Sequence, residues 1–367
     1  MTCLRLRKVL GIASVFSMVV FAALVGLTGS TDLSISSAHA QSAGNVPGGT
    51  LGNVGDPELW RFARRGGCGT VSIPDKSAGC LVQSDGDVLR ALKNGIMSQF
   101  GGWLMLAMVV VLGLFFAFRG RIMIDGGPAG ETIERFNSLE RFAHWLSATS
   151  FIVLALTGLN VLYGRYILMP ILGQEVFANL TYYGKLSHNY IAFAFILGVA
   201  LMFVLWVRDN IPNKHDLTWL AAAGGLFTKG VHPPSKRFNA GQKFIFWYVV
   251  IAGLWMTVSG LALLFPLELE SLSGIISLFN FYGLGQGGEL TQLQQTQVAL
   301  LSHGLSGLFF IAVIIGHIYI GSVGMEGAID AVGSGQVDRK WAQDHHDLWV
   351  AEVDEKQAGA DKIQPAE

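Results

Sequence analysis

The sequence of 367 residues carries little charge: only 14% of its residues are Asp, Glu, Lys or Arg, and the formal net charge is −1. A soluble protein typically carries about 25% charged residues, so this composition argues against a soluble globular chain. The balanced charge gives no sign of the basic surface that nucleic-acid binding requires. Apolar residues make up 51% of the chain and gather in long uncharged runs, which is typical of a membrane protein.

Cysteine is also scarce. The three cysteines, Cys3, Cys68 and Cys80, form neither a CxxC nor a CxxCH motif, so the chain lacks the sequence signature of an iron–sulfur, zinc or c-type haem site. The sequence also lacks a GxGxxG motif that precedes a helix, a P-loop and a nucleophile elbow. Any redox activity must therefore come from an inserted cofactor.

The N-terminus has the pattern of a secretory signal: basic residues up to Lys8, an apolar run from Val9 to Leu27, and A-x-A ending at Ala40. This pattern predicts a signal peptide over residues 1–40 that is cleaved after Ala40. Because the apolar run is long for a signal, an uncleaved membrane anchor is the alternative. In the polar segment 41–99 that follows, Cys68 and Cys80 either form a disulfide or remain two thiols.

Five further uncharged runs of about 20 residues are each long enough to cross a bilayer as a helix. They lie near Phe100–Phe118, Phe142–Tyr163, His188–Val207, Phe244–Phe265 and Val298–Ile320. The sequence therefore predicts an all-α integral membrane protein.

The charges of the loops predict the orientation of these spans. Segments 119–141 and 208–243 are rich in Lys and Arg, segment 164–187 has two such residues, and segment 266–297 has none. The positive-inside rule places the first two segments in the cytoplasm and the other two outside. The tail 321–367 is then cytoplasmic.

We expect the protein to lie in the inner (plasma) membrane of a bacterium. The same orientation places segment 41–99 in the periplasm. This segment carries six Lys or Arg residues. Long translocated segments cross largely regardless of charge, so this conflict weakens the predicted topology only slightly.

The last span contains two histidines, His303 and His317, which are 14 residues apart. Fourteen helical residues rise about 21 Å and turn about 40° short of four full turns, so both side chains project from nearly the same face. An imidazole in hydrocarbon needs a partner. We expect this partner to be haem iron, which binds two imidazoles on opposite sides of a flat ring.

Two more histidines lie in the spans, His144 near the predicted cytoplasmic side and His188 near the outer side. By the same orientation His303 is outer and His317 is inner. Depth alone therefore pairs His188 with His303 and His144 with His317, which predicts two bis-histidine b haems, one in each leaflet. The alternative is that each histidine is an interfacial hydrogen-bonding residue.

Small residues near these histidines favour the close approach of a flat cofactor. They are Gly158, Gly304, Gly307 and Gly316. The other histidines, for which we do not expect haem ligation, fall in the signal, the loops or the charged tail. They are His39, His215, His232, His345 and His346, of which the last two are expected to contact a partner or solvent.

Several motifs of this chain occur together in one known family. They are ERFN at Glu134–Asn137, ERFAHW at Glu140–Trp145, RFNAGQK at Arg237–Lys243, the His303/His317 pair, and a tail that runs from Gly335 to His346. Over about residues 134–353 the chain resembles the gamma subunit of membrane-bound formate dehydrogenases, a di-haem cytochrome b of the cytochrome b561-like superfamily. The RFNAGQK loop is the most specific of these motifs.

This resemblance implies a helical bundle with a four-helix cytochrome b domain over residues 134–320, two b haems and a quinone site on the cytoplasmic side. It implies that Asn239, Gly241 and Gln242 line the quinone, which His317 also borders. It further implies two partners, an iron–sulfur beta subunit and a catalytic alpha subunit that holds molybdenum or tungsten. The signal segment, residues 41–99 and the extra transmembrane helix 100–118 are additions to the shorter members of the family.

The residues of the RFNAGQK loop allow two interpretations. Asn239 and Gln242 are neutral donors and acceptors that suit the two carbonyl groups of a quinone, and Lys243 could add a positive charge during reduction. The loop could also simply begin the next helix, with Asn239 as its N-cap. The two roles are compatible.

The sequence thus predicts the cytochrome b subunit of a membrane-bound formate dehydrogenase, which passes electrons from the iron–sulfur subunit through two haems to a membrane quinone and does not itself oxidise formate. One alternative is the cytochrome b subunit of a hydrogenase or a thiosulfate reductase. Another is a non-redox membrane anchor with structural histidines. A transporter is a weaker alternative, because we see no broken helices and no carboxylates in the spans.

Overall fold

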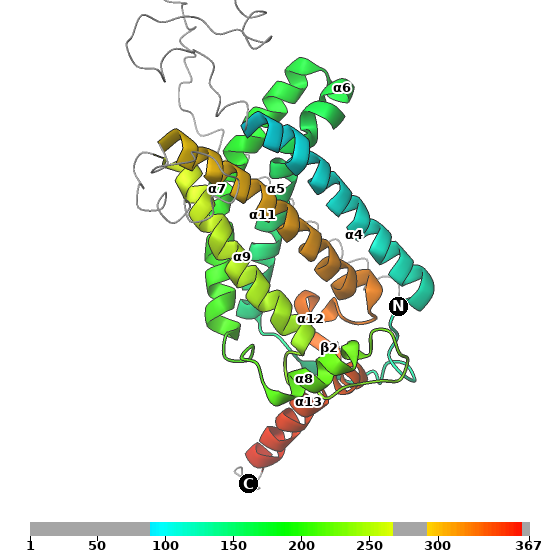
Figure 1. The fold of residues 1–367 in the computed structure, drawn as a ribbon. Helices are drawn as coiled ribbons and strands as arrows, with labels where there is room; N and C mark the ends of the chain where they lie inside the picture. Colours follow the sequence, from blue (N-terminus) through cyan, green and yellow to red (C-terminus); the bar gives the residue numbers. More distant parts are fainter. Residues whose placement is uncertain (1–88, 267–291, 362–367) are drawn as a thin grey trace, which may run out of the picture. The chain divides into compact units, whose positions relative to one another are not determined.

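The computed structural model describes residues 89–266 and 292–361. The predicted signal peptide, the two cysteines of the exported segment and the loop 267–291 lie outside the described residues. Within the described part, five helices are long and apolar enough to cross a membrane, and a single pair of short strands is present (Figure 1). The predicted all-α membrane bundle is confirmed.

The five spanning helices cover the five predicted runs to within one residue, and most of them begin earlier. They are η2 Leu92–Met97 continued by α4 Ser98–Arg119, α5 Ser138–Ile167, α7 Gln174–Trp206, α9 Ala240–Leu264, and α11 Gln292–Tyr319 continued by η4 Ile320–Gly324. His188 therefore lies well inside α7 and not at its beginning, because the residues from Gln174 onwards are helical as well. Likewise, residues 89–99 are helical and belong to the first span.

Four of these helices form a closed ring. α5 packs along α7, α7 packs on α9, α9 packs on α11, and α11 returns to α5. The extra helix α4 lies outside this ring against α11 (Figure 1). Met97 meets Val298, Leu301 and Leu308 in a buried apolar cluster near this contact. α11, which carries His303 and His317, thus packs against α9 and α5 of the ring and against α4 outside it.

Asparagine fixes the start of two spanning helices. Asn137 caps α5 in a capping box with Glu140, and Asn239 caps α9 in a capping box with Gln242. In each box the asparagine side-chain oxygen accepts a hydrogen bond from the backbone N–H of the third helical residue. The side chain of that residue accepts a hydrogen bond from the backbone N–H of the asparagine. The interpretation of Asn239 as an N-cap is confirmed.

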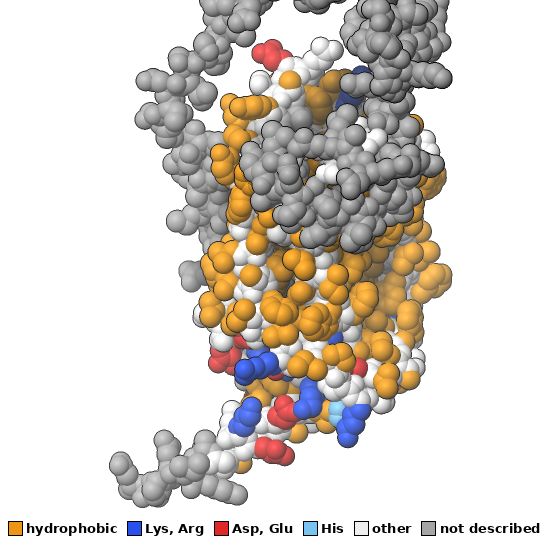
Figure 2. Space-filling view, turned by 60° about the vertical axis from the view of Figure 1, so that its left-hand side comes forward, with side chains coloured by type: hydrophobic (Ala, Val, Ile, Leu, Met, Phe, Trp, Pro, Cys, Tyr) orange, Lys and Arg blue, Asp and Glu red, His pale blue; other side chains and the backbone are white. Residues whose placement is uncertain are grey.

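Charged side chains gather at one end of the bundle (Figure 2), and most of the elements outside the spans lie at this end (Figure 1). Here β1 Thr132–Glu134 pairs antiparallel with β2 Gln336–Asp338. The other short elements of the described chain are α6 Met169–Leu172, α8 Lys214–Ala221, η3 Ala223–Gly225, α12 Asp330–Gly333 and α13 Arg339–Asp361. Of these, α6 joins α5 to α7 at the opposite end, and the rest lie at the charged end (Figure 1).

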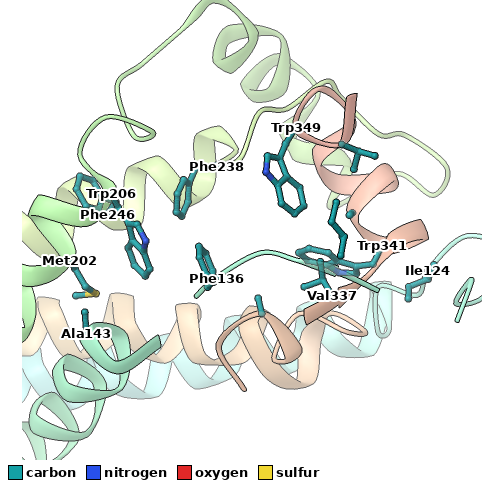
Figure 3. Close-up of a cluster of buried hydrophobic side chains, with 14 residues drawn as sticks. Ile124, Phe136, Ala143, Met202, Trp206, Phe238, Phe246, Val337, Trp341 and Trp349 are labelled. Atoms are coloured by element: carbon teal, nitrogen blue, oxygen red, sulfur yellow. The ribbon is translucent and has the colours of Figure 1, made fainter. Parts of the chain in front are cut away.

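A hydrophobic cluster fastens the tail to the charged end. It runs from Met202 and Trp206 of α7 through Phe136 and Phe238 to residues of α13, among them Trp349 (Figure 3). Burial of aromatic side chains of this size stabilises the packing by about 2 kcal/mol each. Residues 324–353 are therefore part of the folded unit.

Candidate haem and quinone sites

The structure brings the four histidines of the spans together in two pairs. His188 of α7 faces His303 of α11, with ring centroids 6.4 Å apart and ring planes 64° apart. His144 of α5 faces His317 of α11, with ring centroids 6.3 Å apart and ring planes 59° apart. These are the two pairs that depth predicted. Because His303 and His317 share α11, the pairs are separated by about 21 Å along that helix.

The spacing within each pair suits a single metal ion between the rings. An imidazole nitrogen binds a metal at about 2 Å and lies about 1.1 Å from its ring centre, so two opposed ligands put their centroids about 6.2 Å apart. Both observed separations match this value. The residues present therefore fit a bis-histidine haem at either level.

Hydroxyl groups hold the outer pair, His188 and His303. Thr157 Oγ1 lies 2.8 Å from His188 Nδ1, and it also donates to the Val153 carbonyl at 2.7 Å. Ser259 Oγ lies 2.9 Å from His303 Nδ1 and donates to the Trp255 carbonyl at 2.8 Å.

Each of these hydroxyls donates its one hydrogen to a backbone carbonyl, so its oxygen can accept a hydrogen bond from Nδ1–H of the histidine. This bond fixes the tautomer and leaves Nε2 as the nitrogen available to a metal. Such a second bond is characteristic of metal-binding histidines, since it orients the ring and raises the basicity of the ligand.

Among the described residues, no hydroxyl group bonds a ring nitrogen of the inner pair, His144 and His317. His144 Nδ1 is buried and has no hydrogen-bond partner. The neighbours of these rings are aromatic: Trp145 packs edge-on against His144 at 5.6 Å, and its indole nitrogen donates to the Val332 carbonyl of α12. The two pairs thus share a spacing but differ in what holds them.

The predicted glycines have different roles in the structure. A Cβ atom at Gly158 would lie 3.7 Å from the His188 ring, so this glycine does lie against an outer ring. Gly304 and Gly307 instead make room for the side chains of Met97 and Met256. Gly260 of α9, which the sequence did not single out, lies closest: its Cβ atom would be 3.3 Å from His303 Cε1.

The three predicted quinone residues lie at the start of α9. The capping box uses the side-chain oxygens of Asn239 and Gln242, which leaves their amide NH2 groups available as donors. Gly241 lies against the Trp219 ring, where a Cβ atom would approach to 2.9 Å.

The predicted role of Lys243 is not supported. Its ammonium is buried and bonds both carboxylate oxygens of Asp216, at 2.9 and 3.0 Å, and the Ile211 carbonyl. A buried lysine needs such a partner, so this charge is committed to the fold.

A buried arginine stands directly behind this loop. Arg135 is 2% exposed and donates to the Arg237 carbonyl at 2.6 Å and to His346 Nε2 at 3.0 Å. It approaches Gln242 Oε1 at 3.5 Å. Four aromatic rings surround its guanidinium at 5.1 to 5.9 Å: Phe136, Phe238, Trp341 and Trp349. Burial lowers the pKa of Arg135 to about 9, so it remains charged at neutral pH.

The expectation that His346 contacts a partner or solvent is wrong. Its side chain is fully buried, and α13 is interrupted at this residue, where the backbone has φ −151° and ψ 48°. Its Nδ1 donates to the Lys236 carbonyl at 2.8 Å, so Nε2 is free to accept from Arg135. His345, beside it, packs on Trp341 and His232.

Comparison with known proteins adds three relatives. The chain is 28% identical over 224 residues to the cytochrome b556 (Fdo) subunit of formate dehydrogenase from Escherichia coli strain K12, which covers 61% of this chain and 94% of that protein. It is 25% identical over 228 residues to the nitrate-inducible cytochrome b556 (Fdn) subunit from the same strain, covering 62% and 94%. The cytochrome b556 subunit of formate dehydrogenase from Haemophilus influenzae is 23% identical over 223 residues, covering 60% and 83%.

The match to a family model covers the four helices of the ring and all four paired histidines. Residues 135–332 match the family of prokaryotic cytochrome b561, so the chain belongs to this family of membrane cytochromes, which bind haem b.

Proposed function

We propose that this chain is the cytochrome b subunit of a membrane-bound formate dehydrogenase. The observation that carries the proposal is the pair of histidine sites, at 6.3 and 6.4 Å, stacked about 21 Å apart on one helix. The names of the relatives add formate as the source of electrons, and they favour this complex over a hydrogenase or a thiosulfate reductase. The partners are then an iron–sulfur subunit and a formate-oxidising subunit with molybdenum or tungsten.

The four histidines divide into two pairs. His188 and His303 would hold the outer b haem, and His144 and His317 would hold the inner one. Haem bound at these two levels would supply one-electron redox chemistry on both halves of the bilayer. Moving one electron against the membrane potential stores about 2.3 kcal/mol per 100 mV.

The chain has its outer level towards the periplasm of a bacterial inner membrane, as the loop charges predict. Residues 1–40 are the signal, 41–88 are exported, 134–320 form the cytochrome domain, and the part beyond it is cytoplasmic. Electrons therefore enter on the periplasmic side and leave at the charged end of the bundle.

A membrane quinone is reduced at this charged end. The NH2 groups of Asn239 and Gln242 can donate to its carbonyl oxygens, and Gly241 would border the site beside Trp219. The buried cation of Arg135 lies behind Gln242 and favours negative charge that develops on the quinone before protons arrive.

The haem assignment is tested by counting haem. The full chain is purified as wild type and as His303→Ala, His317→Ala and His215→Ala, and its b-type haem is measured from the reduced spectrum. Two haems are expected in wild type and in His215→Ala, whose histidine lies outside the spans. One haem is expected in each of the other two variants. Retention of both haems in His303→Ala or His317→Ala would remove the ligand assignment.

The quinone assignment needs a variant that separates capping from donation. Asn239→Asp keeps a good N-cap but loses the NH2 donor, whereas Asn137→Asp makes the same change at the start of α5. Loss of one hydrogen bond worth about 1 kcal/mol should slow reoxidation of the reduced haems by a short-chain quinone about fivefold in Asn239→Asp. Asn137→Asp should be unchanged. Equal rates in the two variants would leave Asn239 as a cap only.

A further inference from the structure

A cavity of about 350 Å³ opens at the charged end of the bundle, and neither the four paired histidines nor the proposed quinone residues line it. Three segments form it: the end of α4 with the linker that follows, the loop after η3, and the tail at Met325 and His345. Neither His317 nor Asn239, Gly241 or Gln242 lines it. The α4 wall precedes residue 135, where the family match begins, so the cavity depends on the additional helix of this chain.

Positive charge dominates the lining. Arg119, Arg121 and Lys229 face the cavity, and none of them forms an ion pair within the part of the chain that the structure describes. Arg119 is held in place because its Nε donates to the Leu226 carbonyl at 2.8 Å, which leaves both terminal nitrogens for a ligand. The lining includes one carboxylate, Asp125, which already bonds His232 Nε2 at 2.7 Å.

The rim of the cavity is apolar. Met123 and Val231, which line it, are 54% and 38% exposed, and Phe227 next to the lining is 72% exposed. The lining begins at Arg119, the last residue of the spanning helix α4, so the cavity lies at the end of a membrane span, where lipid head groups are expected. Figure 2 shows the apolar surface of the bundle giving way to charged side chains at this end. Phe227 packs edge-on against Phe115 of α4 at 5.7 Å, which ties the loop to the spanning helix.

We propose that this cavity binds a phosphate-bearing anion, and that this anion is the head group of an anionic membrane lipid. Arginine binds phosphate oxygens through its planar fork of N–H groups, and lysine adds a point charge. Basic pockets at the cytoplasmic ends of membrane helices bind such head groups. A free phosphate ion would have the same contacts with the cations but would gain nothing from the apolar rim.

The test measures lipid binding, so it does not depend on the haem assignment. The full chain in detergent is titrated with phosphatidylglycerol or phosphatidylcholine, and bound lipid is counted by native mass spectrometry. The double variant Arg121→Gln/Lys229→Gln removes two cations of the cavity. The matched control, Arg208→Gln/Lys214→Gln, removes one exposed Arg and one exposed Lys at the same end but outside the lining.

Wild type should prefer phosphatidylglycerol to phosphatidylcholine. Its affinity for phosphatidylglycerol should fall about 30-fold in Arg121→Gln/Lys229→Gln, because each cation contributes about 1 kcal/mol, and it should change little in the control. Should the double variant fold poorly, each single change should cost about fivefold.

Three results would overturn the proposal. The first is equal affinity for phosphatidylglycerol in the cavity variant and its matched control. The second is equal binding of the two lipids by wild type. The third is displacement of phosphatidylglycerol by inorganic phosphate at a concentration no higher than the Kd of the lipid, which would identify a free phosphate compound as the ligand.

Discussion

The outer and inner histidine pairs have almost the same spacing but are held in different ways. At the outer pair, a hydroxyl group and a glycine from neighbouring residues of the spans contact each ring. At the inner pair, His144 Nδ1 has no partner among the described residues, and the ring packs edge-on against Trp145, whose indole nitrogen donates to the Val332 carbonyl of α12. The spanning helices alone define the outer site, whereas the inner site also depends on the elements packed at the charged end.

This difference follows from the two environments. Inside hydrocarbon, a ring nitrogen can find a partner only on a neighbouring helix, so hydroxyls placed on α5 and α9 serve the outer pair. At the charged end, loops and the tail can enclose the site. Under the proposed function, this site would exchange protons and quinone with its surroundings, which requires surrounding elements that can move. Four predictions test this contrast, from the largest expected effect to the smallest.

Gly260→Leu should abolish the outer haem and leave the inner one. A Cβ atom at this position already meets His303 Cε1 at 3.3 Å, so a larger side chain must displace the ring. Displacing an axial ligand should reduce the haem content of the purified chain from two to one, and the remaining spectrum should be that of the inner site.

Gly102→Leu is the matched control, because Gly102 lies on α4 and its Cβ atom would meet nothing within 4 Å. It should retain both haems. If Gly260→Leu also retained both with unchanged spectra, the outer ring would not be fixed by its helices as we infer.

Arg135→Met should loosen the inner end and spare the outer one. The substitution removes the donor to the Arg237 carbonyl and to His346 Nε2, both of which are left in a buried site. Each unpaired buried group costs about 1–3 kcal/mol, so α13 should become far more accessible to proteases. The exposed Arg208→Met is the control. An unchanged rate of cleavage within α13 would mean that the aromatic cluster alone holds the tail.

Sequence patterns predicted the spans, the histidine pairs and the cap at Asn239 for a clear reason. Hydrocarbon tolerates few polar residues, so long apolar runs and the histidines inside them are conspicuous, and helix geometry then gives their depth. The second residue of a pair could be matched by depth without knowledge of the packing. The proposed quinone loop was predicted from the RFNAGQK motif through the family resemblance.

Contacts between distant segments could not be predicted in this way. Arg135 and His346 are 211 residues apart, and no local period links them, so the sequence alone predicts that His346 contacts a partner or solvent. Lys243 was assigned a role near the quinone because the sequence does not show that Asp216 folds back onto it. Thr157 and Ser259 were missed, although a hydroxyl within an apolar span was a usable signal.

Acid should weaken the docking of the tail through His346. Burial, followed by the positive charge of Arg135 and then His345, holds the pKa of His346 well below its usual value near 6.5. Its neutral form therefore stabilises the fold above pH 6.5, and this contribution is lost as the pH falls, at up to about 1.4 kcal/mol per pH unit. The melting temperature reported by tryptophan fluorescence should drop between pH 7.5 and 5.5.

His346→Gln keeps a donor and an acceptor but does not titrate, so its melting temperature should drop less over the same range. His345, whose pKa burial lowers to about 4, remains in both proteins and cancels in the comparison. Parallel pH profiles for the two proteins would contradict the role of His346.

The smallest effect is expected from the hydroxyls of the outer pair. In Thr157→Ala and Ser259→Ala the Nδ1–H of one ligand loses its acceptor, so the imidazole becomes a weaker electron donor and the oxidised iron is stabilised less. The midpoint potential of the outer haem should rise by about 30 mV in each variant, since a tenfold change in a one-electron equilibrium corresponds to about 59 mV. Thr149→Ala and Thr257→Ala remove hydroxyls that bond only the backbone of α5 and α9, and they should shift neither potential. A shift of the inner potential instead, or equal shifts in all four variants, would mean that the outer hydroxyls do not distinguish the two sites.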